Sequence, residues 1–510
     1  MTPLKLLFLT SELAPFSSTG GLAYVAQSFP KHLRERGVDA RIIAPRFGAA
    51  LEAVAGQLRE VDRFTLSIGG VERECVIELL EQGGNLMYFV RNDHFFARER
   101  LYGYPDEAER FVFLNEAVLR FCARGHFVPD IFNGNDWLSS PLPLLLRTRF
   151  AAEPALAGCK VLLNIRNLRY QGMFHKDVCA LLGVEWGALC ADGLDFYDYV
   201  NLLKIGIAHA DMIVTSSPSY AREIQVDGYD PLTPSLRRRA AVLYGVVEGI
   251  DVEIDDPATD PRIEHNYGGS SGAPADPAVA IGAKRANKAA LQRQLGLPER
   301  PEVPVIGWIN RLTSQKGVDL IRLALGNGLL DEDIQIVACA DGEPIFEEFF
   351  RKVAAEHPDK FFYTNYREAL AYRIYAAADM YLMPSSYEPG GISQLIAMRY
   401  GAVPIVRATG GLADTVQPFD PASGTGTGYV FDFKSTWIMM HTVRRALAAY
   451  RDRPLWERLV GNCMARDSSW SLPIDRYLAL FERLRDSPVR AGTGGPERAG
   501  ASGLHLTSVA

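Results

Sequence analysis

The chain has 510 residues and a formal net charge of −7, with 48% hydrophobic and 23% charged residues. This length exceeds the size at which a single hydrophobic core stops growing, so we expect two domains. The acidic balance argues against a nucleic-acid-binding protein, which would present a basic face. The seven cysteines include no CxxC pair, so their spacing indicates neither a zinc site nor a disulfide framework.

The start of the chain predicts a strand rather than a targeting segment. Residues 5–10 (KLLFLT) are mostly apolar, and the pattern of a charged region, a long apolar core and a cleavage site is missing. The sequence has no run of about 18 apolar residues, which argues against a membrane-spanning helix. We therefore expect a cytoplasmic protein that has no membrane partner.

Short runs of β-type residues alternate with helix-length segments from end to end, which is typical of parallel α/β sheets. In the first half, strands are predicted at 5–10, 40–44, 85–89, 131–134, 160–164 and 212–215, with helices at 22–36 and 107–123 between them. In the second half, strands are predicted at 305–309, 334–338, 361–364, 380–383 and 403–406. This repetition favours two Rossmann-like domains that face each other across a cleft.

The composition predicts where these domains begin and end. We expect an N-terminal domain at 1–243, a C-terminal domain at 244–470, a final helix at 471–486 that packs back on the N-terminal domain, and a disordered tail at 487–510. Residues 268–277 (GGSSGAPADP) have the composition of a flexible linker near this boundary. They fit equally a surface loop inside the second domain.

A glycine-rich turn follows the first predicted strand. Thr19, Gly20 and Gly21 lead into a helix, and the N–H groups of such a turn can face a phosphate. The alternative is a tight strand-to-helix turn that needs glycine only for its backbone conformation. The motif is not GxGxxG, and the chain has no Walker A motif, so hydride transfer and P-loop chemistry lose their usual support.

The segment 383–400 (MPSSYEPGGISQLIAMRY) joins a predicted buried strand to a helix that begins at Ile392. Ligands of open α/β sheets bind beyond the carboxyl ends of the strands. Gly390 and Gly391 let the backbone approach an anion, while Glu388 can receive hydroxyl groups. A sugar nucleotide carries both kinds of group. A solvated loop carboxylate is the alternative reading of Glu388.

Two basic residues follow another predicted strand. Arg311 and Lys316, in INRLTSQKG, would emerge at the same sheet edge and could hold a diphosphate with a planar fork and a point charge. Most Lys and Arg are solvated, so an ordinary surface position is the alternative for each of them.

Several short motifs in one order resemble those of the bacterial glycogen and starch synthases. They are TGGLA (19–23), DHFFARERLYG (93–103), NLRYQGMF (167–174), SPSYAREI (217–224), RLTSQKG (311–317), EPGG (388–391) and TGGLADTV (409–416). The resemblance, which runs from about Lys5 to Glu482, implies a GT-B fold and a retaining transferase. Such an enzyme moves glucose from ADP-glucose, or alternatively UDP-glucose, to the non-reducing end of an α-1,4-glucan. The chain has no metal-ligand spacing such as HExxH, so we expect neither a catalytic metal nor a cofactor.

The resemblance also implies roles for individual residues. The implied catalytic residues are Glu388 beside the donor sugar, Arg311 and Lys316 on the donor diphosphate, and Asp136 in the cleft. The implied donor-binding residues fall into four groups. Gly20 and Gly21 form a loop that closes on the donor, and Arg166, Asn167 and Glu248 lie near its sugar. Tyr366 stacks on the nucleobase, and Gly390, Gly391 and Ile392 lie near the phosphates.

Departures from the family pattern concentrate on the sugar side of the expected cleft. Ser18 and Tyr24 replace the Lys and Asp of KTGGLADV, and Leu138 replaces the second His of HDWH. Further replacements are Asn135 for the first His of that motif, Arg166 for the His of HN, Glu248 for the Asn of NG(V/I)D, Gly390 for the Cys of EPCG and Ile396 for a Tyr. We expect Arg166 and Glu248 to form a compensating pair. A transferase with a changed sugar or acceptor, or a catalytically silent glucan-binding relative, are the alternatives.

Overall fold

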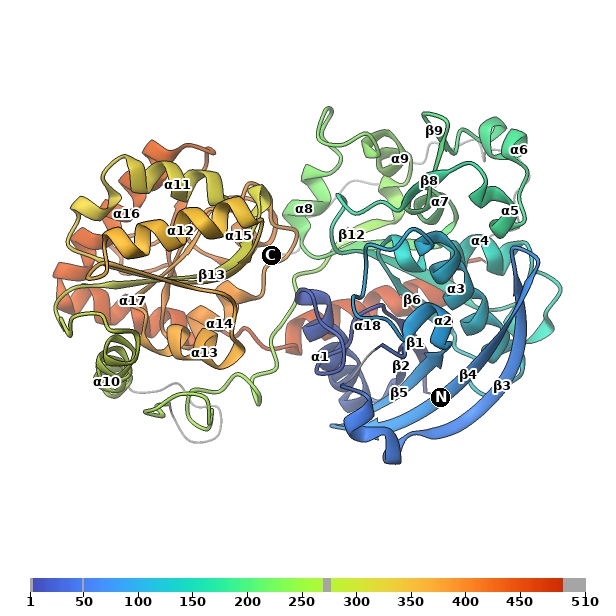
Figure 1. Ribbon diagram of the computed structural model, residues 1–510, viewed down its shortest axis with the longest axis horizontal. Coiled ribbons are helices and arrows are strands. Elements are labelled where there is room, and N and C mark those ends of the chain that lie inside the picture. Colours follow the sequence, from blue (N-terminus) through green and yellow to red (C-terminus); the bar gives the residue numbers. More distant parts are fainter. Residues whose placement is uncertain (1–2, 48–49, 269–276, 489–510) are drawn as a thin grey trace.

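Two twisted sheets, one in each half of the chain, organise the structure (Figure 1). The computed structural model describes residues 3–47, 50–268 and 277–488. The proposed linker at 268–277 lies outside the described residues except for its two ends, and so does the tail from residue 489.

The first sheet has, within the described residues, nine strands in the order β12-β11-β7-β6-β1-β2-β5-β4-β3. Its strands are β1 (Lys5–Leu9), β2 (Asp39–Pro45), β3 (Arg59–Ile68), β4 (Val71–Gln82), β5 (Asn85–Arg91), β6 (Ile131–Asn135), β7 (Lys160–Ile165), β11 (Met212–Thr215) and β12 (Leu243–Gly245). The seven strands from β12 to β5 pair in parallel, while β4 runs antiparallel to both β3 and β5. Its parallel part is apolar and buried because helices cover both faces.

The helices of this half are α1 (Gly21–Glu35), α2 (Asp93–Phe96), α3 (Glu107–Ala123), α4 (Pro141–Arg147), α5 (Val178–Leu182), α6 (Trp186–Ala191), α7 (Leu202–His209), α8 (Pro218–Glu223) and α9 (Thr233–Arg238). A small antiparallel sheet is formed by β8 (Met173–His175), β10 (Tyr199–Asn201) and β9 (Asp195–Phe196).

The second sheet has, in the described part of the chain, six parallel strands in the order β15-β14-β13-β16-β17-β18. They are β13 (Val305–Leu312), β14 (Gln335–Gly342), β15 (Phe361–Thr364), β16 (Met380–Met383), β17 (Val403–Arg407) and β18 (Tyr429–Phe431). The helices around it are α10 (Pro277–Leu295), α11 (Val318–Gly326), α12 (Pro344–Glu356), α13 (Glu368–Ala377), α14 (Ser393–Arg399), α15 (Gly410–Thr415), α16 (Thr436–Arg451) and α17 (Arg453–Ala465).

The chain crosses between the halves twice, and the two crossing segments lie side by side. The Ile250 N–H donates to the Ser468 carbonyl at 2.8 Å. The second crossing leads into α18 (Ser471–Asp486), which contacts α1 in the first half (Figure 1). Tyr477 and Phe481 of α18 are buried in the same apolar core as Phe8 of β1.

Candidate functional site

A cavity of about 960 Å³ lies between the two sheets, and both halves of the chain line it. All thirteen predicted site residues line this one cavity: Gly20, Gly21, Asp136, Arg166, Asn167, Glu248, Arg311, Lys316, Tyr366, Glu388, Gly390, Gly391 and Ile392. They gather there because the carboxyl ends of parallel strands meet at one edge of each sheet. Their chemical roles remain predictions.

Glu388 and Lys316 form the charged centre of the C-terminal wall. The ammonium Nζ of Lys316 lies 2.6 Å from Oε2 of Glu388, which also accepts a hydrogen bond from Ser385 at 3.0 Å. Glu388 is only 4% exposed, so it is not a solvated loop carboxylate. Gly317 has φ +72, and a Cβ there would lie 2.1 Å from the Pro384 carbonyl oxygen. A glycine after Lys316 is therefore what brings this turn against the end of β16.

The two walls also touch each other directly. Arg311 Nη1 lies 3.4 Å from the Tyr170 hydroxyl, and Asn167 Nδ2 lies 3.3 Å from Gln315 Oε1. Arg311 was expected just beyond a strand, but β13 continues to Leu312 and includes it. Its side chain is exposed and contacts the opposite wall across the cavity.

Asp136 follows β6 in a left-handed backbone conformation, with φ 55. Its Oδ1 accepts the N–H groups of Arg166 at 2.7 Å and Asn167 at 3.2 Å. Burial raises the pKa of Asp136 to about 7, and the two backbone hydrogen bonds oppose this shift only in part. A buried carboxyl on a strained backbone supports a functional role at this strand end.

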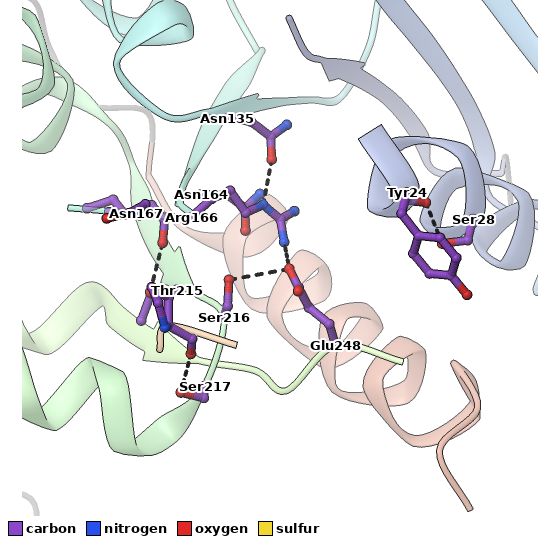
Figure 2. A network of polar contacts seen from close by, with 12 residues as sticks. Tyr24, Ser28, Asn135, Asn164, Arg166, Asn167, Thr215, Ser216, Ser217 and Glu248 are labelled. Atoms are coloured by element: carbon purple, nitrogen blue, oxygen red, sulfur yellow. Dashed lines mark hydrogen bonds and ion pairs between the residues drawn. The ribbon is translucent and has the colours of Figure 1, made fainter. Parts of the chain in front are cut away.

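Arg166 and Glu248 are in direct contact, which confirms the predicted pair (Figure 2). Arg166 Nη1 pairs with Glu248 Oε1, and Arg166 Nε donates to Asn135 Oδ1 at 2.9 Å. Ser216 Oγ lies 3.3 Å from the same Glu248 oxygen. Burial raises the pKa of Glu248, while the charge of Arg166 lowers it. The two charged replacements, Arg166 and Glu248, therefore form an ion pair in the cavity wall.

The glycine turn at the start of α1 is organised by Glu12, which sequence reasoning missed. Its carboxylate accepts the N–H groups of Thr19 at 2.6 Å and Gly20 at 3.1 Å, and the Tyr102 hydroxyl at 2.9 Å. The prediction that these two N–H groups face a phosphate is wrong, because a buried carboxylate already takes them. A Cβ at Gly21 would lie 3.5 Å from Ile392, so this turn adjoins the glycine-containing loop before α14 on the other wall.

Tyr24 joins three segments at the floor of the cavity. Its hydroxyl donates to Asp255 Oδ2 at 2.5 Å and accepts the Asp251 N–H at 2.7 Å. Asp255 also accepts the Tyr372 hydroxyl at 2.6 Å. Burial, followed by the charge of Asp255, raises the pKa of Tyr24 well above its ordinary value. The Tyr that replaces the family's Asp thus links α1, the first crossing segment and α13.

Two family motifs act between the halves of the chain. In SPSYAREI, the N–H and hydroxyl of Ser219 donate to Asp414 at 2.8 and 2.7 Å. Glu223 of the same motif accepts the Gly410 N–H at 2.8 Å and the Thr409 hydroxyl at 3.1 Å, both from TGGLADTV. The first motif spans α8 and the second spans α15. Their hydrogen bonds join the N-terminal half of the chain to the C-terminal half.

Other residues of the cavity had only motif membership as a signal, or none. Tyr102 and Tyr170 belong to quoted family motifs, whereas Glu12, Arg262 and Tyr372 do not. Tyr366, the predicted nucleobase neighbour, is 49% exposed and lines the cavity, as Arg262 and Tyr372 do. The Arg262 guanidinium lies 3.2 Å from the centre of the Tyr372 ring.

Comparison with known proteins identifies the family. Residues 5–234 match the family model of the starch synthase catalytic domain, and residues 288–455 match that of glycosyl transferases group 1. The chain is 42% identical over 489 residues to the glycogen synthase of Anaeromyxobacter dehalogenans (strain 2CP-1), covering 94% of this chain and 99% of that protein. The chain belongs to the glycogen synthase family. It is a glycosyltransferase.

A second relative and one solved structure agree with this assignment, and another solved structure shares the fold. The glycogen synthase of Desulforamulus reducens is 38% identical over 484 residues, which cover 94% of this chain and 99% of that protein. The catalytic domain of starch synthase IV from Arabidopsis thaliana, bound to ADP and acarbose, has a TM-score of 0.86 at 28% identity and covers 95% of this chain and 100% of that one. Sucrose-phosphate synthase from Thermosynechococcus elongatus shares the fold, with a TM-score of 0.58 at 17% identity, over 94% of this chain and 99% of that one. The predicted GT-B architecture of a glycogen synthase is confirmed.

Two absences hold for the described residues, 3–47, 50–268 and 277–488. None of their helices combines the length and apolarity that a bilayer crossing requires. In the same residues, no three His, Cys, Asp or Glu side chains are grouped so that they could hold a metal ion.

Proposed function

We propose that this chain transfers glucose from ADP-glucose to the non-reducing end of an α-1,4-glucan, with retention at the sugar carbon, in the cytoplasm. The observation that carries the proposal is the cavity itself, in which Arg311, Lys316 and Glu388 of one wall face Asp136 and Asn167 of the other. The starch synthase IV structure, which is bound to ADP, supports the choice of adenine over uracil in the donor.

The C-terminal wall supplies the groups that a leaving diphosphate needs. Lys316 has a flexible stem and Arg311 a planar fork of donors, so both can turn toward phosphate oxygens. Charge builds up on the diphosphate as its bond to the sugar breaks, and cations that are already in place stabilise it. Glu388 would then exchange the Lys316 ammonium for hydroxyl groups of the donor sugar.

The N-terminal wall supplies the negative charge that the sugar carbon needs. Positive charge develops there when the diphosphate leaves, and an ionised Asp136 would stabilise it. Asp136 Oδ1 is held by two N–H groups, whereas Oδ2 accepts no hydrogen bond from the described residues. The donor sugar and the glucan acceptor would thus both bind next to Asp136 Oδ2.

The experiment is transfer of label from ADP-glucose or UDP-glucose to glycogen by the purified chain. We expect faster incorporation of label from ADP-glucose than from UDP-glucose. An amylase that cleaves only α-1,4 linkages should release the incorporated label. Lys434, which pairs with Asp319 and does not line the cavity, offers a matched control: Lys434→Ala should keep the activity that Lys316→Ala loses. Incorporation from neither donor would overturn the proposal.

A second candidate is a GT-B transferase that uses a different sugar or acceptor. Two opposite charges, Arg166 and Glu248, stand where glycogen synthases have His and Asn, and this observation favours it. A donor panel read by thermal shift separates it from a silent relative, because a specific ligand raises the apparent stability by mass action.

A further inference from the structure

Two of the family motifs, SPSYAREI (217–224) and TGGLADTV (409–416), lie outside the cavity but next to the loop that carries Glu388. None of their residues, all of which the structure describes, lines the cavity. The first motif contains α8 and the second contains α15, and these two short helices lie side by side where the halves of the chain meet (Figure 1). Any contribution that the motifs make to the reaction therefore passes through other residues.

The start of α15 is packed directly against the backbone of the Glu388 loop. The Gly411 N–H donates to the Glu388 carbonyl at 2.9 Å. A Cβ at Gly410 would collide with the same carbonyl oxygen, and a Cβ at Gly411 would collide with that of Gly390. Because no side chain separates the two segments at these points, a shift of α15 would displace the backbone of Glu388.

The position of α15 is set in turn by α8, which belongs to the other half of the chain. At the start of α15, Glu223 accepts the Gly410 N–H at 2.8 Å and the Thr409 hydroxyl at 3.1 Å. Near its end, Asp414 accepts the N–H and the hydroxyl of Ser219 at 2.8 and 2.7 Å. These hydrogen bonds hold both ends of α15, a helix of six residues.

The loop itself is held from two sides. Before Glu388, Arg407 of β17 lies in the same half of the chain, and its Nε donates to the Ser385 carbonyl at 2.7 Å. After Glu388, the hydroxyl of Ser217, the fully buried N-cap residue of α8, donates to the Pro389 carbonyl at 2.6 Å. The backbone that follows Glu388 thus depends on the N-terminal half for its position.

We propose that Ser217, Ser219 and Glu223 are positioning residues for the transfer. They hold the backbone that follows Glu388, directly or through α15, so that its carboxylate is directed at the donor sugar. A displacement of about 1 Å at a reacting centre can cost about 10²-fold in rate, so a few hydrogen bonds to this backbone are enough to control the reaction. The inference rests on the proposed function, because it takes Glu388 to act on a bound nucleotide sugar.

The first test compares Glu223→Ala with Glu223→Gln. Glu223→Ala removes both acceptor oxygens, and we expect kcat to fall about 10- to 100-fold while KM for ADP-glucose stays within about threefold, because a misplaced Glu388 is felt mainly in the transition state. Glu223→Gln keeps an oxygen for the Gly410 N–H and should retain at least about a third of kcat. A kcat within about twofold of the unaltered chain in Glu223→Ala would overturn the inference.

Gln225→Ala is the matched control on the same helix. The Gln225 side chain is half-buried and donates to the Ala221 carbonyl at 2.7 Å within α8. This variant should keep the full kcat. A loss as large as that of Glu223→Ala would show that any disturbance of α8 slows the reaction, and would contradict a specific role for Glu223.

The second test asks whether Glu223 acts through Glu388. In a chain that carries Glu388→Gln, the further change Glu223→Ala should cost less than about threefold, because the carboxylate that it positions is already lost. Equal losses in both backgrounds would overturn the inference. Where Glu223→Ala fails to fold, Thr409→Val removes one donor to Glu223 and should lower kcat about threefold to tenfold, and Thr409→Ser should recover it. No loss in Thr409→Val, or no recovery, would contradict the inference.

Hydrogen exchange separates this inference from the proposed function. In Glu223→Ala, we expect the Gly411 amide to exchange at least about tenfold faster. The Ser386 amide, which donates to the Gln315 carbonyl at 2.7 Å within the C-terminal half, should keep its rate. If ADP-glucose does not react but exchange changes in this way, the proposed function fails while the coupling of α8 to the Glu388 loop stands. If ADP-glucose reacts but the Gly411 amide keeps its rate, the inference alone fails.

Discussion

On the C-terminal wall of the cavity, Lys316 contacts Glu388, and both belong to motifs shared with glycogen synthases. On the N-terminal wall, Arg166 contacts Glu248, and both depart from those motifs. Each wall thus carries one buried pair of opposite charges, but the pairs are held differently. Lys316 is a point charge on a flexible stem, whereas Asn135 and Glu248 fix the planar fork of Arg166.

The comparison teaches that similar ion pairs can serve opposite purposes. A flexible ammonium can leave its carboxylate for an arriving phosphate, so the first pair is suited to exchange. A guanidinium with two fixed partners resists such exchange, so the second pair is suited to shape a pocket. Six of the eight replacements in the glycogen synthase pattern lie in the N-terminal half of the chain, whereas Arg311, Lys316 and Glu388 keep the motif residues on the C-terminal wall of the cavity.

The largest effect should come from breaking the Arg166–Glu248 pair. Arg166→Ala or Glu248→Ala alone leaves a buried charge without its partner, and we expect each to lower the free energy of unfolding by roughly 3–5 kcal/mol. The double variant should be much less destabilised than the sum of the two. Chemical denaturation of all four chains measures this coupling. Additive losses would show that the pair contributes no coupling energy and that the two walls do not differ as described.

The next effect concerns the wall that is built for exchange. Arg311→Ala and Lys316→Ala should each lower kcat/KM by about 10²- to 10³-fold, because each removes a preorganised cation from the leaving diphosphate. Their unfolding free energies should change less than that of Glu248→Ala. Initial-rate kinetics with ADP-glucose measure this, and normal kinetics in both variants would refute the diphosphate assignment.

The acidity of Asp136 gives a pH test on the N-terminal wall. Its pKa of about 7 lies above the value of an unfolded Asp near 4, so the folded chain binds more protons between these pH values. Its contribution to stability therefore falls as pH rises from about 4 to 7, by up to about 1.4 kcal/mol per pH unit. Asp136→Asn should remove this slope.

Activity should depend on pH in the opposite sense. An ionised Asp136 is needed for the proposed charge stabilisation, so kcat/KM should fall by about tenfold per pH unit below pH 7. Rate profiles and denaturation curves from pH 5 to 8, for the unaltered chain and Asp136→Asn, measure both trends. A flat stability difference between the two chains would contradict the raised pKa.

Much of this geometry could be predicted because it follows from local patterns. Buried apolar runs gave the bounds of β11, β15 and β16 without error, and glycines and charges after strands located the cavity. The hairpin of β3 and β4 was missed, since most of β3 is exposed or half-buried and its side chains carry no continuous apolar run. Strand ends meet at one edge by topology, so residues far apart in sequence could still be grouped correctly.

The missed contacts have a different origin. Glu12 occupies the N–H groups of the glycine turn, and nothing in the spacing of that turn reveals a carboxylate seven residues earlier as its partner. Tyr24 and Asp255 are separated by 231 positions and meet only because the crossing segment passes beneath α1. A short motif predicts the local backbone conformation. Side-chain hydrogen bonds between distant residues depend instead on how the two sheets and the segments between them are arranged.

The smallest expected effect concerns the connection between the walls. Tyr24→Phe removes a hydroxyl that contacts Asp255 and the Asp251 N–H, which should lower the free energy of unfolding by about 1 kcal/mol. Tyr363→Phe is the matched control, since its hydroxyl donates to the Ala340 carbonyl at 3.0 Å within one sheet. Both variants should lose similar stability, but only Tyr24→Phe should raise KM for ADP-glucose, because Tyr24 ties the glycine-turn helix to α13 at the cavity. Equal KM values in the two variants, measured at matched temperature, would mean that Tyr24 stabilises the fold without linking the walls.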